Sequence, residues 1–187
     1  MQGPLTERSV LLVSEPLAPG GIASYTRHLM EGLSTAGINH PLITSAPGPF
    51  GVLPESELRH VEVVNTLFWT FVRPLVFRKL VAWARDQDVA LIHGLSAFTA
   101  PLCTRLADAL DVPFILAVHH YQSPGGLRTA RRCAALITVS ESLRENLVND
   151  AGVPKDLVRL IPAGVRVPRE SPPAGPPAAG EASVPLV

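Results

Sequence analysis

The residues of this chain that can do chemistry stand at the ends of its apolar runs or in the segments that follow them. They are two neighbouring glycines, three histidines and a serine: Gly20, Gly21, His93, His119, His120 and Ser140. Glycines let a backbone approach an anion closely, and the free N–H groups at the start of a helix bind phosphate. Imidazole and hydroxyl groups hydrogen-bond to substrates or carry protons. These residue types favour a polar site with an anion-binding loop.

Each of these residues also has a purely structural interpretation. Gly20 and Gly21 suit a tight turn before a helix, whether or not a ligand binds there. His93 suits a hydrogen-bonded position in the core. His119 and His120 are neighbours, and neighbours on a strand point to opposite faces, so they are poorly placed to share one metal ion. We expect no metal site.

The composition describes a globular protein. Apolar residues make up 47% of the 187 residues and charged residues 17%, which is unlike a disordered chain. The 16 basic residues balance the 16 acidic ones, so the overall charge does not favour nucleic acid as a partner. Cys103 and Cys133 are interpreted as free thiols of a reducing compartment, and the N-terminus lacks the apolar stretch of a secretory signal. A cytoplasmic protein is expected.

Short apolar runs alternate with helical patterns along the chain. The runs are rich in Val, Ile and Leu without strict alternation, as in strands buried on both faces: Val10–Val13, His40–Thr44, Val61–Val64, Val89–His93, Phe114–His119, Leu136–Val139 and Leu157–Ile161. Apolar residues at steps of three and four predict three helices, Ile22–Leu33, Ala97–Leu110 and one from about Ser140. In the third helix, Ser142 and Glu145 fit a capping box.

This alternation predicts an α/β fold: a Rossmann-like, doubly wound domain with a mainly parallel sheet and helices on both faces. In such a sheet the carboxyl ends of the strands share one edge, and ligands bind there. The glycine, histidine and serine residues named above follow four different strands. We therefore expect them to converge on one cleft.

Two segments bear on the domain organisation and on membranes. Residues 1–168 are interpreted as the domain, and residues 169–187 as a Pro-, Gly- and Ala-rich linker followed by the first residues of a second domain. The apolar segment Asn65–Ala84 contains three cations and a proline, so it does not span a bilayer. It suits a helix that covers the sheet, and it also suits peripheral contact with an anionic membrane surface.

Four segments follow one another in a recognisable order: PLAPGGIASYTRHLMEGLSTAG, DVALIHGLSAF, VPFILAVHHYQS and CAALITVSESLRENLVNDAGVPKDLVRLIPAGV. Together they resemble the N-terminal, acceptor-side domain of a group 1 (family 4) glycosyltransferase of the GT-B architecture, in which two Rossmann-like domains face each other. The resemblance covers about Val10 to Val167. The donor-binding half of such enzymes, with its G-R-x-x-x-x-K and E-x7-E motifs, is not in this chain.

The resemblance implies a hexosyltransferase that uses a nucleotide-diphosphate sugar as substrate, with no metal or other cofactor. Gly20 and Gly21 would offer N–H groups to the donor's diphosphate. His119 would contact the donor sugar near the reacting carbon, in a positioning and electrostatic role, because most members retain the anomeric configuration without a clear nucleophile. The other polar residues would face the acceptor: His93, His120 and Ser140. The isolated chain is expected to be inactive without its donor-binding partner domain.

Two other functions fit parts of the sequence. A dehydrogenase-type nucleotide-binding domain would need G-x-G-x-x-G after the first strand and a carboxylate at the end of the second. The second strand instead runs into LITSAP, with no carboxylate for a ribose. A non-catalytic subunit that docks a separate donor-binding chain is the other alternative.

Overall fold

The computed structural model describes residues 8–15, 20–44, 61–63, 74–125, 127, 132–162 and 164. Within them, seven strands form one parallel sheet in the order β3-β2-β1-β4-β5-β6-β7. The strands are β1 (Ser9–Val13), β2 (Leu42–Thr44), β3 (Val61–Val63), β4 (Val89–Gly94), β5 (Phe114–Val118), β6 (Cys133–Thr138) and β7 (Val158–Leu160). All seven predicted strands are therefore confirmed, with ends that move by a few residues.

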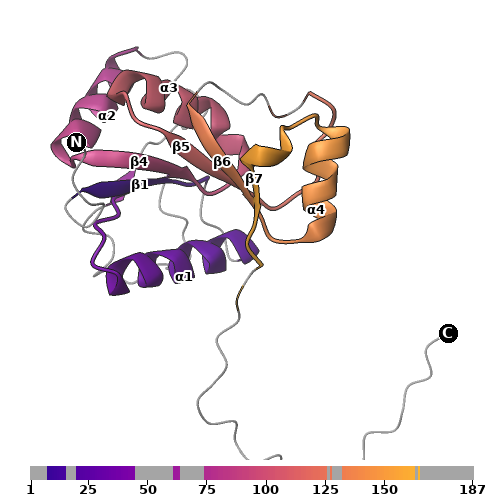
Figure 1. The fold of residues 1–187 in the computed structure, drawn as a ribbon. Coiled ribbons are helices and arrows are strands. Elements are labelled where there is room, and N and C mark those ends of the chain that lie inside the picture. Colours follow the sequence, from indigo (N-terminus) through magenta and orange to yellow (C-terminus); the bar gives the residue numbers. More distant parts are fainter. Residues whose placement is uncertain are drawn as a thin grey trace, which may run out of the picture.

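Helices cover both faces of this sheet. They are α1 (Gly21–Thr35), α2 (Pro74–Asp86), α3 (Ala100–Leu110) and α4 (Glu141–Glu145), with the short helical turns η3 (Ala97–Thr99), η4 (Asn146–Asp150) and η5 (Lys155–Leu157). Figure 1 shows α1 below the sheet and α2 and α3 above it. The strand order reverses at β1, because β2 lies on one side of it and β4 on the other. The predicted doubly wound, Rossmann-like α/β fold is confirmed.

The central strand β1 explains why the apolar runs lack alternation. All five of its residues are buried. Leu11 and Val13 pack in the cluster that includes residues of α2 and α3, whereas Val10 and Leu12 pack in the cluster that includes residues of α1. Successive side chains of a strand point to opposite faces, so a strand covered on both faces has a run of apolar residues without alternation, here four of the five.

Two helix ends differ from the prediction. The hydroxyl of Ser140 accepts the hydrogen bond of the Leu143 N–H at 3.3 Å, so Ser140 caps α4. The predicted capping box of Ser142 and Glu145 is wrong, because the helix begins two residues earlier. Pro74 is the first residue of α2 and does not interrupt it, since proline lacks only an N–H that would be unpaired at a helix start.

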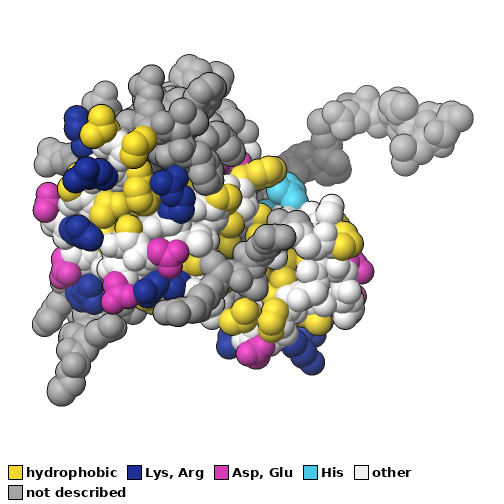
Figure 2. Space-filling model, turned by 90° about the horizontal axis from the view of Figure 1, so that it is seen from above, with side chains coloured by type: hydrophobic (Ala, Val, Ile, Leu, Met, Phe, Trp, Pro, Cys, Tyr) yellow, Lys and Arg dark blue, Asp and Glu magenta, His cyan; other side chains and the backbone are white. Residues whose placement is uncertain are grey.

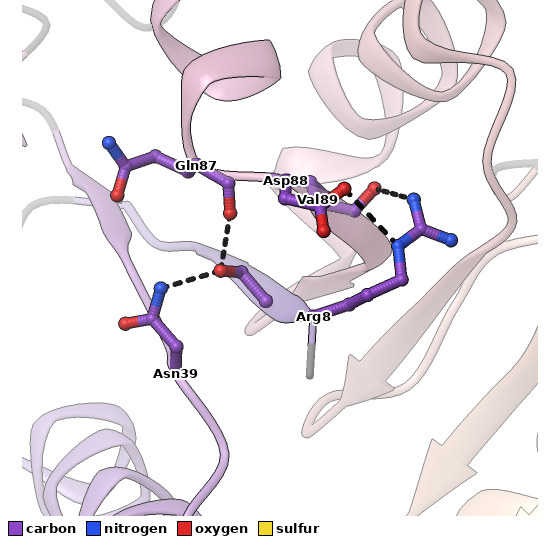
Figure 3. Close-up of polar contacts among 6 residues, drawn as sticks. Arg8, Asn39, Gln87, Asp88 and Val89 are labelled. Atoms are coloured by element: carbon purple, nitrogen blue, oxygen red, sulfur yellow. Dashed lines mark hydrogen bonds and ion pairs between the residues drawn. The ribbon is translucent and has the colours of Figure 1, made fainter. Parts of the chain in front are cut away.

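The amino edge of the sheet is a closed hydrogen-bond network (Figure 3). The buried hydroxyl of Ser9 donates to the carbonyl of Gln87 and accepts from the side-chain amide of Asn39, both at 2.5 Å. Arg8 Nε lies 3.3 Å from the carboxylate of Asp88. These contacts join the start of β1 to the turn before β4, which is about 80 residues away in sequence.

Part of the segment 65–84 belongs to the core. α2 buries Leu80, Val81 and Ala84 against the sheet and α3, which confirms the core-helix interpretation for this part. Residues 65–73 lie outside the described residues, as do residues 169–187, which the sequence predicts as a linker and the start of a second domain. In the described parts of the chain, no helix has the length and apolar character needed to cross a membrane.

Candidate functional site

Tyr25, His93 and His119 form a cluster at the carboxyl edge of the sheet. The Tyr25 ring, from α1, meets the His119 ring edge-on with the ring centroids 4.9 Å apart. The Tyr25 hydroxyl lies 3.5 Å from Nε2 of His93, near the end of β4. His119 follows directly after β5. One helix and the ends of two neighbouring strands thus bring together two predicted site residues, His93 and His119, around a tyrosine.

Both clustered histidines are held in the neutral form. Burial, and next to it the charge that His119 can carry, lower the pKa of His93 to about 4. Burial also lowers the pKa of His119, His120 lowers it further, and the backbone of Leu95 opposes this shift. Each imidazole therefore has one N–H donor and one nitrogen acceptor at neutral pH. Burial raises the pKa of Tyr25, so its hydroxyl also stays neutral.

Two buried polar atoms at this edge have no hydrogen-bond partner among the described residues: Oγ of Ser96 and Nε2 of His119. Ser96 is 3% exposed and precedes η3 without capping it. It neighbours Leu95, whose backbone contacts the His119 ring. Buried polar groups of folded proteins are nearly always hydrogen-bonded. These two atoms are therefore candidates for contact with a ligand.

Gly20 and Gly21 begin α1 beside this cluster. Gly20 has φ 156° and ψ −169°, a conformation that other residues rarely adopt, and an added Cβ would meet open space. The first intrahelical bond runs from Ser24 N to Gly20 O, so the N–H groups of the first turn before it have no intrahelical partner. Tyr25 lies four residues after Gly21, about 6 Å along the helix axis. Residues 16–19 of the preceding loop lie outside the described residues.

The remaining predicted residues have separate surroundings. His120 is exposed, and its carbonyl accepts a hydrogen bond from the Gln122 side chain at 2.9 Å. Ser140 is half-buried, and its hydroxyl is used by the α4 cap and by Ser142. Within the described residues, no three His, Cys, Asp or Glu side chains gather as metal ligands would.

The sequence analysis missed Tyr25 and Ser96 as site residues. Tyr25 falls within the predicted helix Ile22–Leu33 and was given no role in the site, although it lies about one turn after the two glycines and so shares their end of the helix. Ser96 lies two residues after the end of β4, the strand that contains His93. In both cases the missing information was a contact between elements, which spacing along one element does not supply.

Comparison with known families decides what kind of protein carries this site. A sequence model of glycosyltransferase family 4 matches residues 19–169, more than three quarters of the chain. The chain belongs to glycosyltransferase family 4. The matched range contains every residue of the candidate site, from Gly20 to Ser140. No curated protein matches the chain by sequence.

Solved structures agree with the family assignment. HepE of Anabaena, in complex with UDP, has a TM-score of 0.65 and 18% identity over 83% of this chain and 44% of its own. A glycosyltransferase from Rickettsia africae gives 0.67 and 16% over 84% and 44%, and MurG of Acinetobacter baumannii gives 0.57 and 10% over 87% and 48%. This family 4 chain therefore has the fold of one GT-B domain, and it spans less than half the length of these three structures.

Proposed function

We propose that the chain is the acceptor-side half of a glycosyltransferase that moves a hexose-type sugar from a nucleotide-diphosphate sugar to an acceptor. The acceptor is a glycan, a lipid-linked molecule or a small molecule, and the anomeric configuration is retained. The observation that carries the proposal is His119: a neutral imidazole at the carboxyl edge whose Nε2 is buried and unpartnered among the described residues. HepE, which is similar in fold, has been solved with UDP-glucose.

In this proposal His119 positions the donor sugar and does not act as a general base. Its lowered pKa makes the ring a weak proton acceptor. Its Nε2 has no partner within the described part of the chain, so a sugar hydroxyl can hydrogen-bond to it. Tyr25 fixes the orientation of the ring from α1. An interaction held in place before the reaction costs no reorganisation in the transition state.

Gly20 and Gly21 receive the donor diphosphate in the same proposal. The open space over Gly20 lets a phosphate approach the backbone, and the uncapped N–H groups of the first helical turn point toward it. The diphosphate gains negative charge as it leaves, so these donors stabilise the transition state more than the ground state. No metal or cofactor is needed for this step.

The acceptor side is assigned to His120 and Ser140, with His93 in support. His120 is exposed beside His119. His93 is 4% exposed and reaches the Tyr25 hydroxyl, so we assign it a supporting contact behind Tyr25 and no direct contact with the acceptor.

Binding measurements on this chain and on the complete enzyme test the proposal. Because half a site forfeits most contacts to the donor, calorimetry with UDP-glucose and this chain alone should show no binding in the micromolar range. Joined to a donor-binding half, the chain should support sugar transfer. Micromolar binding to the chain alone would contradict the division of labour. Transfer that occurs only with a separate donor-binding chain, and survives loss of His119, would identify a docking subunit.

The proposal includes a peripheral membrane contact through α2 at the cytoplasmic face. Leu75, Arg78, Lys79 and Ala82 are exposed along this helix. Figure 2 shows Lys and Arg side chains among apolar ones on the face seen from above, where Figure 1 places α2 and α3. Cations near an anionic surface contribute about 1 kcal/mol each. More of the protein should sediment with anionic vesicles than with neutral ones. The fraction bound to anionic vesicles should fall when salt is added and in the double variant Arg78→Ala/Lys79→Ala. Equal sedimentation with both vesicles would remove this contact.

A further inference from the structure

The segment that carries His119 leaves the sheet at Val118 and is held by a side chain from another element. Oδ1 of Asn146 accepts a hydrogen bond from Gln122 N at 2.7 Å. Nδ2 of the same side chain donates to Gln122 O at 3.2 Å. Asn146 is 8% exposed. One buried amide thus satisfies both backbone groups of Gln122, as a neighbouring strand would.

Asn146 is itself fixed in orientation. Its Nδ2 also donates to the carboxylate of Asp150 at 2.8 Å, and a carboxylate only accepts, so the amide cannot exchange its oxygen and nitrogen without losing this bond. Asn146 opens the π-helical turn η4, and the next residue, Leu147, is fully buried. Such π-turns are frequent at functional sites. The amide is therefore aimed at Gln122 by a rigid frame.

The segment 119–122 is consequently held at two ends by two different helical elements. At its start, the His119 ring packs edge-on against Tyr25 of α1. At its end, Gln122 is held by Asn146 of η4. Between these points the side chain of Tyr121 is 67% exposed, so it adds little packing of its own. The position of the His119 Nε2 therefore depends on the contact at each end.

We propose that Asn146 is a positioning residue for the sugar transfer: by holding Gln122, it keeps the unpartnered Nε2 of His119 in place at the carboxyl edge. The inference rests on the function proposed above. Asn146 touches no substrate and acts through the segment 119–122. Misplacement of a catalytic group by about 1 Å can cost about a hundredfold in rate, so a contact three residues away from His119 matters for the reaction.

Nuclear magnetic resonance on this chain tests the positioning without any need for activity. In Asn146→Ala, Gln122 loses both partners and the segment loosens, so water reaches the His119 ring. Its pKa should rise toward the ordinary value, because burial is the main cause that lowers it. Amide exchange at Gln122 should accelerate at least about tenfold. The matched control is Arg144→Ala, which breaks only the exposed ion pair with Glu141 on α4 and should leave the His119 titration unchanged.

Two further variants keep the test decisive. Asp150→Ala leaves both bonds to Gln122 but frees the amide, so it should shift the His119 titration in the same direction by less. Asn146→Asp with Asp150→Asn keeps an acceptor for Gln122 N and a hydrogen bond between residues 146 and 150, so its His119 titration should lie between those of Asn146→Ala and the wild type. If Asn146→Ala does not fold, Asp150→Ala takes its place. A His119 titration identical to wild type in folded Asn146→Ala or, where that variant does not fold, in Asp150→Ala would overturn the proposal, even if the melting temperature falls.

Kinetics of the complete enzyme then connect the positioning to the reaction. Asn146→Ala should lower kcat by about tenfold to a hundredfold, with little change in the KM for the donor, whereas Arg144→Ala should keep the wild-type kcat. An unchanged kcat beside a shifted His119 titration would overturn the catalytic part of the inference. Absence of sugar transfer by the wild-type enzyme would instead count against the proposed function, and the magnetic resonance result would stand by itself.

Discussion

Two buried serines, one at each edge of the sheet, have opposite surroundings. Ser9 at the amino edge is 2% exposed, and its hydroxyl both donates to Gln87 and accepts from Asn39. Ser96 at the carboxyl edge is 3% exposed, and its Oγ has no partner among the described residues. The side chains are identical and equally buried. Burial is therefore not what separates the two edges; the satisfaction of polar groups is.

The difference separates stability from function within one sheet. A hydrogen-bonded buried hydroxyl stabilises the fold, whereas an unpaired one costs about 1–3 kcal/mol. At the amino edge the network joins β1 to the turn before β4. At the carboxyl edge Ser96 Oγ and His119 Nε2 have no partner within the described chain, and burial lowers the pKa values of both His93 and His119. Two unpaired buried atoms at one edge are uncommon in a folded protein, and the proposed function accounts for them with a ligand at that edge.

The largest expected effect is at His119, in the complete enzyme. His119→Ala should lower kcat and kcat/KM together by about 10²–10³-fold, because the lost interaction is made in the transition state. The melting temperature should change little, since the ring is only half-buried. Steady-state kinetics and thermal unfolding of the same variant measure both quantities.

His120→Ala is the matched comparison, because His120 is exposed beside it and should cost less activity. A His119→Ala enzyme with wild-type turnover would contradict the prediction. So would a variant with a strongly lowered melting temperature and nearly unchanged turnover, because His119 would then be a structural residue, as Ser9 is.

The second effect is a pH dependence that originates at His93. Its pKa is about 4 in the folded protein and about 6.5 when unfolded. Between these pH values the unfolded state binds more protons than the folded state. The contribution of His93 to the free energy of unfolding is therefore fully present above pH 6.5 and is lost as the pH falls to 4. The loss from this residue is about 3 kcal/mol at most. Urea unfolding at pH 7, 6, 5 and 4 measures it in this chain.

Carboxylates also titrate in this range, so the comparison is made with His93→Gln, which cannot gain a charge. The free energy of unfolding of the variant should depend less on pH between 6.5 and 4 than that of the wild type. If the free energies of unfolding of the two proteins change in parallel with pH, the prediction is contradicted, because folding would then not lower the pKa of His93.

The smallest effect compares the two serines directly. Ser9→Ala removes the hydrogen-bond partner of the Gln87 carbonyl and of the Asn39 side-chain amide. The free energy of unfolding should therefore fall by about 1–3 kcal/mol. Ser96→Ala removes a hydroxyl that has no partner in the described chain, so stability should stay the same or rise slightly. Chemical denaturation of this chain checks both variants. Equal losses for Ser9 and Ser96 would mean that both edges are structural.

Most of the fold could be predicted from the sequence because its strands are short apolar runs between helical patterns. β1 is the clearest case, since burial on both faces requires five buried residues in succession. Helix starts were less predictable. Either Ser140 or Ser142 has the chemistry of a cap, and the choice depends on which residue adopts the extended backbone, which is Ser140.

The site was predictable only in part. His93 and His119 could be placed because residues that follow parallel strands meet at one edge. Tyr25 and Asn146 could not be assigned roles, because each acts through a contact with a distant segment: Tyr25 with both histidines, and Asn146 with Gln122, 24 residues earlier. Sequence spacing describes one element at a time, whereas these contacts depend on how elements pack.

The central place of β1 also governs how the chain is made. β1 pairs with β4 in the register Ser9 to Val89, about 80 residues later. A ribosome adding about 5–20 residues each second needs about 4–16 s to produce that partner. During this interval the apolar strand emerges without β4 beside it; of the described elements that precede β4, β2 can pair with it, and α1 and α2 can pack on its two faces. We therefore expect the newborn chain to expose part of this apolar strand until β4 is made, which is the kind of surface that chaperones bind.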